Sequence, residues 1–195
     1  MIDAQSDLAW LTSDALEVAP QLLGCELISQ TATGETAGRI VEVEAYHGAI
    51  DPASHAYRGR TIRNAPMFEA GGTVYAYFTY GMHTCVNITT GPAGEAQAVL
   101  IRALEPTRGI ELMRARRPDR ALVQLTNGPA KLTQALGITL AQSGSRLGEQ
   151  LRLEPPASPI EPSHIHTGPR IGIKQATDRP WRFWLAGNPF VSRNH

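Results

Sequence analysis

Residues 38–46 combine side chains capable of acid–base chemistry with the pattern of a β-strand. Glu42, Glu44 and Tyr46 recur at every second position, and the small or β-branched residues between them complete a period that predicts a strand. Alternate residues of a strand share one face, so the two carboxylates and the ring should lie together. This face suits a general base with a carboxylate neighbour. The competing interpretation is a solvent-exposed strand face without a catalytic role.

A cationic loop is expected directly after this strand. Residues 47–66 show no pattern of a packed element, and unstructured loops of about twenty residues in compact domains are usually functional or disordered. The stretch between Pro52 and Phe68 has no acidic residue, and its histidine and arginines are His55, Arg58, Arg60 and Arg63. We interpret the loop as part of a site. A solvated surface loop is the alternative.

Arg102 interrupts the apolar run 97–106, which predicts a central strand. A buried arginine needs a partner for its charge, and Glu42 and Glu44 are the expected partners on an adjacent strand. Residues 73–82 and 83–90 predict a β-hairpin that carries Tyr75 and Tyr77 on one face and Tyr80 at its tip.

Length and composition predict one soluble domain spanning residues 1–195, with 42% hydrophobic and 18% charged residues. The sequence has no apolar run of membrane length and no signal segment after Met1, so we expect no membrane partner and a cytosolic location. Cys25 and Cys85 are isolated from each other in the sequence. They predict reduced thiols rather than a disulfide framework.

Charge is distributed unevenly although the net charge is zero. Acidic residues outnumber the single base Arg39 in residues 1–54, so the remainder of the chain is net positive. Such asymmetry indicates an anionic partner, unless folding interleaves the two parts. Only Lys131 and Lys174 are lysines, and the preference for arginine suits phosphate binding and base stacking.

Mixed helix and strand signals occur along the chain. The helices are expected at 14–24 with Ser13 as the cap, at 107–119 with Thr107 as the cap, and from Pro129 onward. Further strands are expected at 25–30, around 171–173 and at 181–186. The fold class is therefore α+β: a curved, mainly antiparallel sheet flanked by helices, with a protruding β-hairpin.

The chain resembles the alkyladenine (3-methyladenine) DNA glycosylase family. The resemblance extends from Leu22 to Ser192, and its most specific parts are residues 38–46, 80–82 with Asn87, 100–106 and 128–132. It implies an enzyme that flips a damaged purine out of double-stranded DNA and cleaves its N-glycosidic bond with water. No cofactor and no metal are implied. His83 and the stretch around Tyr57 and Arg58 depart from the family pattern. These differences bear on lesion preference and on the exact backbone contacts, not on the chemistry.

The resemblance also implies roles for individual residues. Glu44 would be the general base, Arg102 would hold the water or a phosphate, and Glu42 would support them. The substrate-binding residues would be the stacking pair Tyr46 and Tyr77, with His55, Asn87 and Leu100. Tyr80 and Met82 would enter the gap left in the base stack. The backbone contacts would be Arg60, Thr61, Arg63 and Lys131.

We expect a monofunctional glycosylase that acts as a monomer, cytoplasmic in a bacterium or nuclear in a eukaryote. Strand cleavage by an amine is not expected, because Lys131 and Lys174 are remote in sequence from the carboxylate strand. Two other classes remain open. A metal-dependent hydrolase would recruit histidines such as His47, His55, His83, His164 and His166 with Glu42. A non-catalytic module would recognise damaged nucleic acid without needing Glu44 and Arg102.

Overall fold

The computed structural model describes residues 6–79, 83–148, 150–156 and 158–192. The α-helices are α1 (Ala15–Leu22), α2 (Ile110–Arg116), α3 (Leu122–Thr126) and α4 (Pro129–Leu136). The 3₁₀ helices are η1 (Ser6–Thr12), η2 (Gly48–Ile50), η3 (Ala65–Phe68), η4 (Leu140–Gln142) and η5 (Pro162–His164). In the described part of the chain, no helix is both long enough and apolar enough to cross a membrane.

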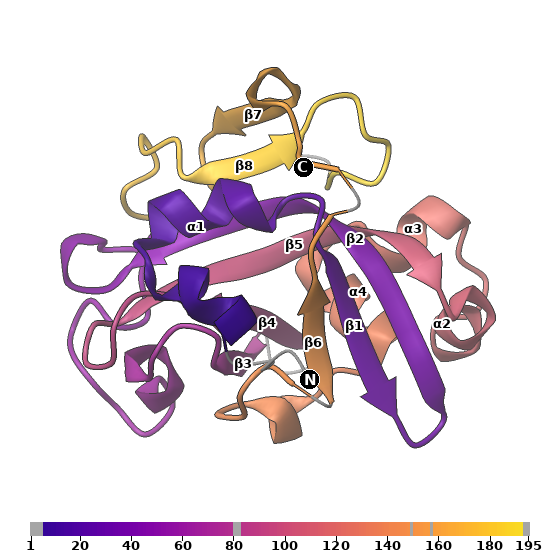
Figure 1. Ribbon diagram of the computed structural model, residues 1–195, viewed down its shortest axis with the longest axis horizontal. Coiled ribbons are helices and arrows are strands. Elements are labelled where there is room, and N and C mark those ends of the chain that lie inside the picture. The colour runs from indigo at the N-terminus through magenta and orange to yellow at the C-terminus, as the bar shows by residue number, and fades with distance from the viewer. Residues whose placement is uncertain (1–5, 80–82, 149, 157, 193–195) are drawn as a thin grey trace.

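An eight-stranded sheet with antiparallel pairings organises the molecule (Figure 1). Its strands are β1 (Glu26–Thr31), β2 (Gly34–His47), β3 (Val74–Thr79), β4 (His83–Thr89), β5 (Gln97–Arg108), β6 (Leu151–Glu154), β7 (Ile165–Gly168) and β8 (Arg182–Leu185). The order is β3-β4-β5-β2-β1-β6, and β8 pairs with both β2 and β7. The expected α+β class with an antiparallel sheet is confirmed.

β2 and β5, the two longest strands, are irregular at the point where the carboxylates and the arginine meet. Ile40 pairs with Leu104 and Glu42 with Ala103, so Val41 is an extra residue on β2. The next pair along β2 is Val43 with Ile101, which leaves Arg102 as the extra residue on β5. A bulge re-aims the side chain that it carries. These bulges therefore set the direction of Arg102 beside β2.

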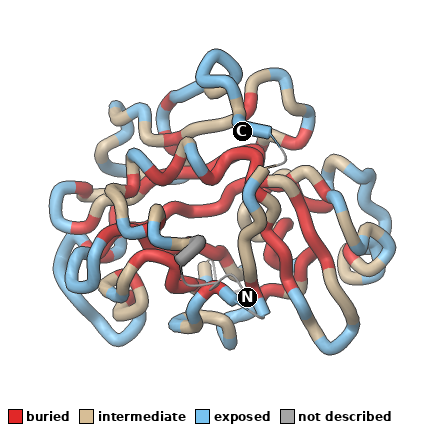
Figure 2. Tube along the Cα trace, viewed as in Figure 1, coloured by how far each residue is buried: buried red, intermediate tan, exposed pale blue. Residues whose placement is uncertain are grey.

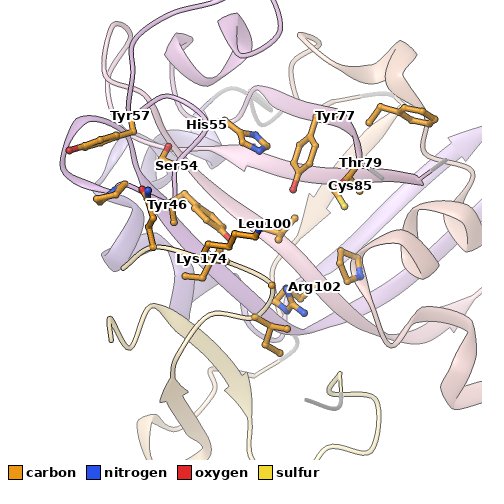
Figure 3. Close-up of a pocket in the computed structure, with 18 of the residues that line it drawn as sticks. Tyr46, Ser54, His55, Tyr57, Tyr77, Thr79, Cys85, Leu100, Arg102 and Lys174 are labelled. Carbon is orange, nitrogen blue, oxygen red and sulfur yellow. The ribbon is translucent and has the colours of Figure 1, made fainter. Parts of the chain in front are cut away.

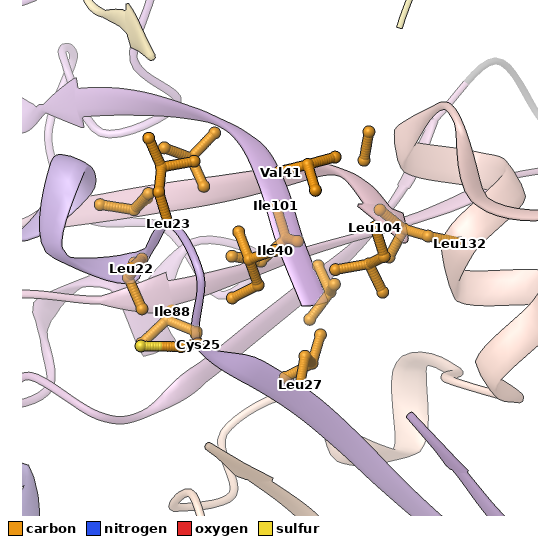
Figure 4. Packing of buried hydrophobic residues seen from close by; sticks show 14 of the residues in the cluster. Leu22, Leu23, Cys25, Leu27, Ile40, Val41, Ile88, Ile101, Leu104 and Leu132 are labelled. Carbon is orange, nitrogen blue, oxygen red and sulfur yellow. The ribbon is translucent and has the colours of Figure 1, made fainter. Parts of the chain in front are cut away.

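Residues 40–45 of β2 are all buried, so the interpretation of this strand as having a solvent-exposed face is wrong (Figure 2). Glu42 and Glu44 have no exposed surface at all. Leucines from α1 and α4 pack in the same cluster as β-strand residues, and this cluster includes Leu22, Leu23, Ile40, Ile101 and Leu132 (Figure 4). Cys25 and Cys85 are buried and form no disulfide.

Two expected helix starts are wrong. Asp14, not Ser13, caps α1, because its carboxylate accepts a hydrogen bond from the Leu16 amide at 2.8 Å. β5 continues to Arg108, whose guanidinium binds glutamates of β1, β2 and β6 and keeps this part of the chain extended. Gly109 then takes a left-handed conformation (φ 69°), and α2 begins at Ile110 instead of after Thr107.

The strand expected around residues 171–173 is also wrong. This segment is a bend outside the sheet, because the Ile171 amide donates to the Glu44 carboxylate rather than to a neighbouring strand. The loop at 47–66 contains the short turns η2 and η3 but no longer element. Both segments approach the same end of β2, and both line the site described below.

Candidate active site

Glu44 is buried and is held from three directions. Its Oε1 atom accepts from the Ile171 amide at 2.7 Å and lies 3.1 Å from Nη1 of Arg102. Its Oε2 atom accepts from the Tyr46 hydroxyl at 2.8 Å. The strand period brings Tyr46 to this side of β2, the bulge of β5 brings Arg102, and the 170–175 segment brings the amide. These contacts fix the carboxylate in one orientation.

Glu42, like Glu44, has protein donors at both carboxylate oxygens, but its donors are Arg102, Arg182 and Ser192. Its Oε1 atom accepts from Arg102 Nε at 3.0 Å, from Arg182 Nε at 2.6 Å and from the Ser192 hydroxyl at 2.8 Å. Its Oε2 atom accepts from the Ser192 amide at 2.6 Å. A carboxylate engaged in this way anchors its neighbours, which agrees with the supporting role expected for Glu42.

A pocket of about 1020 Å³ opens beside the residues that hold Glu44 (Figure 3). It is lined by Tyr46, Arg102 and Ile171, the three residues that contact Glu44, whereas Glu44 itself does not line it. The carboxylate therefore lies directly behind the pocket wall. A pocket of this size is ample for a purine base, since small-molecule sites usually span about 300–1,000 Å³.

Aromatic side chains form much of the pocket wall. Tyr46, His55, Tyr77 and Leu100 all line it, as the sequence resemblance implies (Figure 3). The His55 ring meets the Tyr77 ring edge to face, with centroids 4.6 Å apart. Its Nδ1 atom lies 3.0 Å from the hydroxyl of the buried Tyr75. These contacts fix the orientation of the imidazole at the pocket.

Desolvation controls protonation in this wall. It raises the pKa of Tyr75 to about 12, and it also raises the pKa of Tyr77 and of Tyr46. For Tyr46 the nearby Glu44 carboxylate adds to the effect. Burial of the His55 ring among the tyrosines lowers its pKa, and Arg63 lowers it further, although the residue as a whole is exposed. The wall is therefore lined by neutral rings near pH 7.

Arg170 and Asp51 form a fully buried ion pair behind Tyr46. Arg170 donates from Nη2 to Asp51 Oδ1 at 2.8 Å and from Nη1 to Asp51 Oδ2, and neither side chain is exposed. Its guanidinium carbon lies 4.6 Å from the centroid of the Tyr46 ring. Sequence reasoning missed this pair.

Asn87 is buried one layer away from the pocket rather than in its wall. Its side-chain amide donates to the Tyr75 carbonyl at 3.0 Å, and the residue pairs across the strands with Leu100, which does line the pocket. Tyr80 and Met82, expected at the hairpin tip, lie outside the described residues.

The residues expected to contact the DNA backbone have partners within the protein. Arg60 forms an ion pair with Glu69 at 3.2 Å, and the Thr61 amide donates to Asn64 at 2.6 Å. Arg63 donates to the Phe78 carbonyl at 2.9 Å and lies over the Tyr77 ring, so it ties the cationic loop to the hairpin. Arg63 lines the pocket, whereas Arg60 and Thr61 do not.

The two lysines lie in different surroundings. Lys131, on α4, donates to Asn127 at 2.8 Å, and desolvation together with nearby arginines lowers its pKa. Lys174 lines the pocket (Figure 3). Remoteness from β2 in sequence therefore does not keep Lys174 away from the site, and it is no argument against a reaction of this lysine.

Three of the residues that a metal-dependent hydrolase would use have partners within the protein. His47 pairs with Asp14 at 2.9 Å, His55 contacts Tyr75, and Glu42 is engaged by arginines and Ser192. Among the described residues, no three His, Cys, Asp or Glu side chains form a group with metal-binding geometry.

Several site residues carry no signal in the sequence. Ile171 and Lys174 lie in a segment that resembles a strand, and they reach the pocket only through tertiary packing. Asp51 and Arg170 are 119 positions apart. The one hint in the sequence is that Arg170 directly precedes the apolar residues 171–173. A buried arginine requires a carboxylate partner, as for Arg102.

An antiparallel α+β fold that holds a glutamate behind an aromatic pocket, with an arginine in the pocket wall, has the layout expected for the mixed α+β class of purine-lesion DNA glycosylases. The methylpurine-DNA glycosylase family model matches residues 9–189. The chain therefore belongs to the methylpurine-DNA glycosylase family.

Similar proteins occur in archaea and bacteria. One from Methanoculleus marisnigri is 49% identical over 188 residues, covering 95% of this chain and 97% of its own. One from Burkholderia orbicola is 52% identical over 190 residues, covering 94% and 89%. One from Nocardia farcinica is 48% identical over 191 residues, covering 93% and 88%. All three are provisionally named 3-methyladenine DNA glycosylases.

Proposed function

We propose that this protein excises alkylated or deaminated purines, the 3-methyladenine, 7-methylguanine and hypoxanthine class, from double-stranded DNA. It hydrolyses the N-glycosidic bond and leaves an abasic site. The observation that carries the proposal is the position of Glu44, a buried carboxylate fixed by Arg102, Tyr46 and the Ile171 amide behind a pocket of base size. The provisional names of the relatives support 3-methyladenine as a substrate.

Glu44 serves as the general base. Its Oε1 atom already has two partners, whereas the described residues give Oε2 the Tyr46 hydroxyl alone. A carboxylate has about four acceptor sites, so Oε2 has the capacity for a further hydrogen bond from a water that enters from the pocket through the wall formed by Tyr46, Arg102 and Ile171. The water gives its proton to Glu44, its oxygen bonds to C1′ of the sugar, and the electrons of the broken bond leave with the base. A positioned base contributes about 10²–10⁴-fold in rate.

The pocket walls offset the cost of flipping. Extrusion of a nucleotide costs a few kcal/mol, least where the base is damaged. Stacking on an aromatic ring contributes roughly 1–3 kcal/mol per base, so Tyr46 and Tyr77 together supply the right order of magnitude. Leu100 provides an apolar contact between these walls.

His55 recognises the edge of the flipped base through a hydrogen bond. Tyr75 keeps its proton because its pKa is about 12, and its hydroxyl lies 3.0 Å from His55 Nδ1. If Tyr75 donates to Nδ1, then the neutral imidazole carries its proton on Nε2 and offers a donor to the base. Asn87 rejects the guanine 2-amino group. It pairs with Leu100, a residue of the pocket wall, and this pairing supports an indirect role in which Asn87 sets the shape of the wall at Leu100.

The remaining DNA contacts in this proposal come from the family resemblance. Tyr80 fills the vacated place in the stack, with Met82 beside it. Arg60, Thr61, Arg63 and Lys131 contact the backbone. Since the chain has no net charge, non-specific binding should be weak and should fall less steeply with salt than for a basic protein.

The reaction is purely hydrolytic in this proposal. Alkylated purines carry positive charge and leave readily, so a base that activates water suffices for them. Lys174 lines the pocket, which makes covalent capture of the product the competing reaction. Borohydride trapping distinguishes them: we expect no covalent protein–DNA adduct from the wild type. An adduct that disappears in Lys174→Ala would establish the lyase reaction instead.

The decisive test is release of hypoxanthine and 3-methyladenine from duplex DNA by the wild type, Glu44→Gln and Glu111→Gln. Glu111 is a matched control, because its side chain on α2 is 90% exposed. We expect excision by the wild type and by Glu111→Gln, and a loss of at least about 10²-fold in Glu44→Gln. Full activity of Glu44→Gln would remove Glu44 from its assigned role.

The same experiment tests the second candidate, a module that binds damaged nucleic acid without cleaving it. The aromatic pocket alone is compatible with this function. Tight binding of lesion DNA by a wild type that releases neither base would favour the binding module. The Glu44–Arg102 pair favours the enzyme, because a binding module gains nothing from two buried charges.

A further inference from the structure

The Arg170–Asp51 pair contacts two components of the site although neither residue lines the pocket. The Arg170 guanidinium carbon lies 4.6 Å from the centroid of the Tyr46 ring and 5.1 Å from that of Trp181. Its Nη1 atom also donates to the Ala45 carbonyl at 2.9 Å, on the strand between Glu44 and Tyr46. One side chain thus holds both the ring and the backbone of β2.

The backbone of Arg170 leads directly into the residue that binds Glu44. Ile171 follows it in sequence, and the Ile171 amide donates to Glu44 Oε1 at 2.7 Å. The 170–175 segment is a bend outside the sheet, so no strand pairing fixes this amide. Its position depends on where the Arg170 side chain anchors the segment.

Asp51 supplies the other end of the anchor. It accepts hydrogen bonds from both terminal nitrogens of Arg170. It belongs to the loop that carries His55, four residues later. The pair therefore joins three segments that build the pocket: the end of β2, the cationic loop and the 170–175 segment. Movement of the pair would displace groups on each of them.

Stability alone is a weak reason for this arrangement. Buried ion pairs are often no more stabilising than well-packed apolar residues, because both charges lose their hydration. The buried Nε atom of Arg170 has no hydrogen-bond partner among the described residues, which adds to the cost. Buried groups with such a cost call for a reason beyond packing.

Building on the proposed function, we infer that Arg170 and Asp51 are positioning residues, which align the Glu44 carboxylate and the Tyr46 ring for reaction without touching the substrate. The planar fork of arginine is essential to this role. It binds both oxygens of Asp51 while its face contacts Tyr46. A lysine at the same place keeps the charge but cannot do both.

The test compares Arg170→Lys and Asp51→Asn with the wild type in two measurements. One is the single-turnover excision rate at saturating enzyme. The other is the dissociation constant for duplex DNA that contains a tetrahydrofuran abasic analogue. A misplacement of about 1 Å in a catalytic group costs roughly 10²-fold in rate. We expect this loss in rate for both variants, with a dissociation constant changed less than about threefold.

Arg146→Lys is the matched control. Arg146 also ties loop segments together, through the carbonyls of Ala70 and Gly71 at 2.9 and 2.8 Å, and it does not line the pocket. We expect its excision rate to equal that of the wild type. Thermal unfolding identifies any variant that is not folded, and the rates are compared only between folded samples.

The outcomes separate the two claims. Wild-type rates in folded Arg170→Lys and Asp51→Asn would overturn the positioning role while leaving the proposed function intact. A rate and an affinity that fall together, in proportion to the folded fraction, would show a structural role only and would overturn it too. A wild type that releases no base would overturn the proposed function itself.

Discussion

Arg102 on β5 contacts both Glu44 and Glu42 on β2: its Nη1 atom lies 3.1 Å from Glu44 Oε1, and its Nε atom donates to Glu42 at 3.0 Å. The two carboxylates are fully buried, and the Arg102 cation, which contacts both, offsets the repulsion between them. Burial would lower the pKa of Arg102, but Glu44 and Glu42 outweigh that effect and raise it. The arginine therefore stays charged at every pH at which the protein would work.

Removal of this cation should destabilise the fold strongly. Arg102→Leu leaves two buried carboxylates with one partner fewer, and breaking a buried pair in this way costs about 3–5 kcal/mol in the free energy of unfolding. Arg39→Leu is the control, since Arg39 and Glu105 form a partly exposed pair that should contribute less than about 1 kcal/mol. Urea unfolding measures both. Equal losses would show that Arg102 is not the central charge of the site.

Tyr46 should contribute to reaction and to binding through different atoms. Tyr46→Phe removes the hydrogen bond to Glu44 Oε2 but keeps the ring. We expect the single-turnover rate to fall by up to about tenfold, as for the loss of one hydrogen bond of about 1 kcal/mol, with unchanged affinity for lesion DNA. Tyr46→Ala should also lose stacking, and so roughly 1–3 kcal/mol of binding. Equal affinities of the two variants would contradict a stacking role.

The sequence alone was sufficient for the part of the site that depends on local rules. The period of two in residues 38–46 predicts that Glu44 and Tyr46 share a face, and the hydrogen bond between them confirms it. The charge of Arg102 within an apolar strand predicts a carboxylate partner, because a buried charge must be paired. Neither argument requires knowledge of the tertiary fold.

Features that depend on packing between distant segments were not predictable in this way. The Asp51–Arg170 pair joins two loops, and nothing in either loop specifies the other. Ile171 has the composition of a strand residue, but its amide is directed to Glu44 by the anchor of Arg170. Lys174 belongs to the same segment and lines the pocket, although it is remote from β2 in sequence.

Stability should depend on pH through His55. Its pKa is lowered from 6.5 in the folded state. At pH values between the folded pKa and 6.5, the unfolded chain therefore binds more protons than the folded one. The contribution of the neutral His55 ring to the stability of the fold is therefore fully present above pH 6.5, and it is lost as the pH falls toward the folded pKa. Unfolding midpoints in urea, measured from pH 8 to 5, should decline less for His55→Gln than for the wild type. Parallel curves would show that His55 titrates normally.

Gly48 sets the direction in which the chain leaves β2. A Cβ atom at this position would lie 2.4 Å from the Ala96 carbonyl oxygen, a contact that only backbone movement can relieve. Gly48→Ala should therefore cost about 1–3 kcal/mol of stability, as overpacking does in other buried sites. It should also lower the excision rate, because the displaced loop carries Asp51 and His55.

Gly148→Ala is the control for this prediction. A Cβ atom there would meet nothing within 4 Å, and substitutions at such open positions usually change stability by less than about 0.5 kcal/mol. Urea unfolding and single-turnover excision, measured on both variants, separate the two effects. A Gly48→Ala protein as stable and active as Gly148→Ala would mean that the loop accommodates the methyl group without moving the site. The path of the chain from Glu44 to His55 would then not depend on the close approach of Gly48 to Ala96.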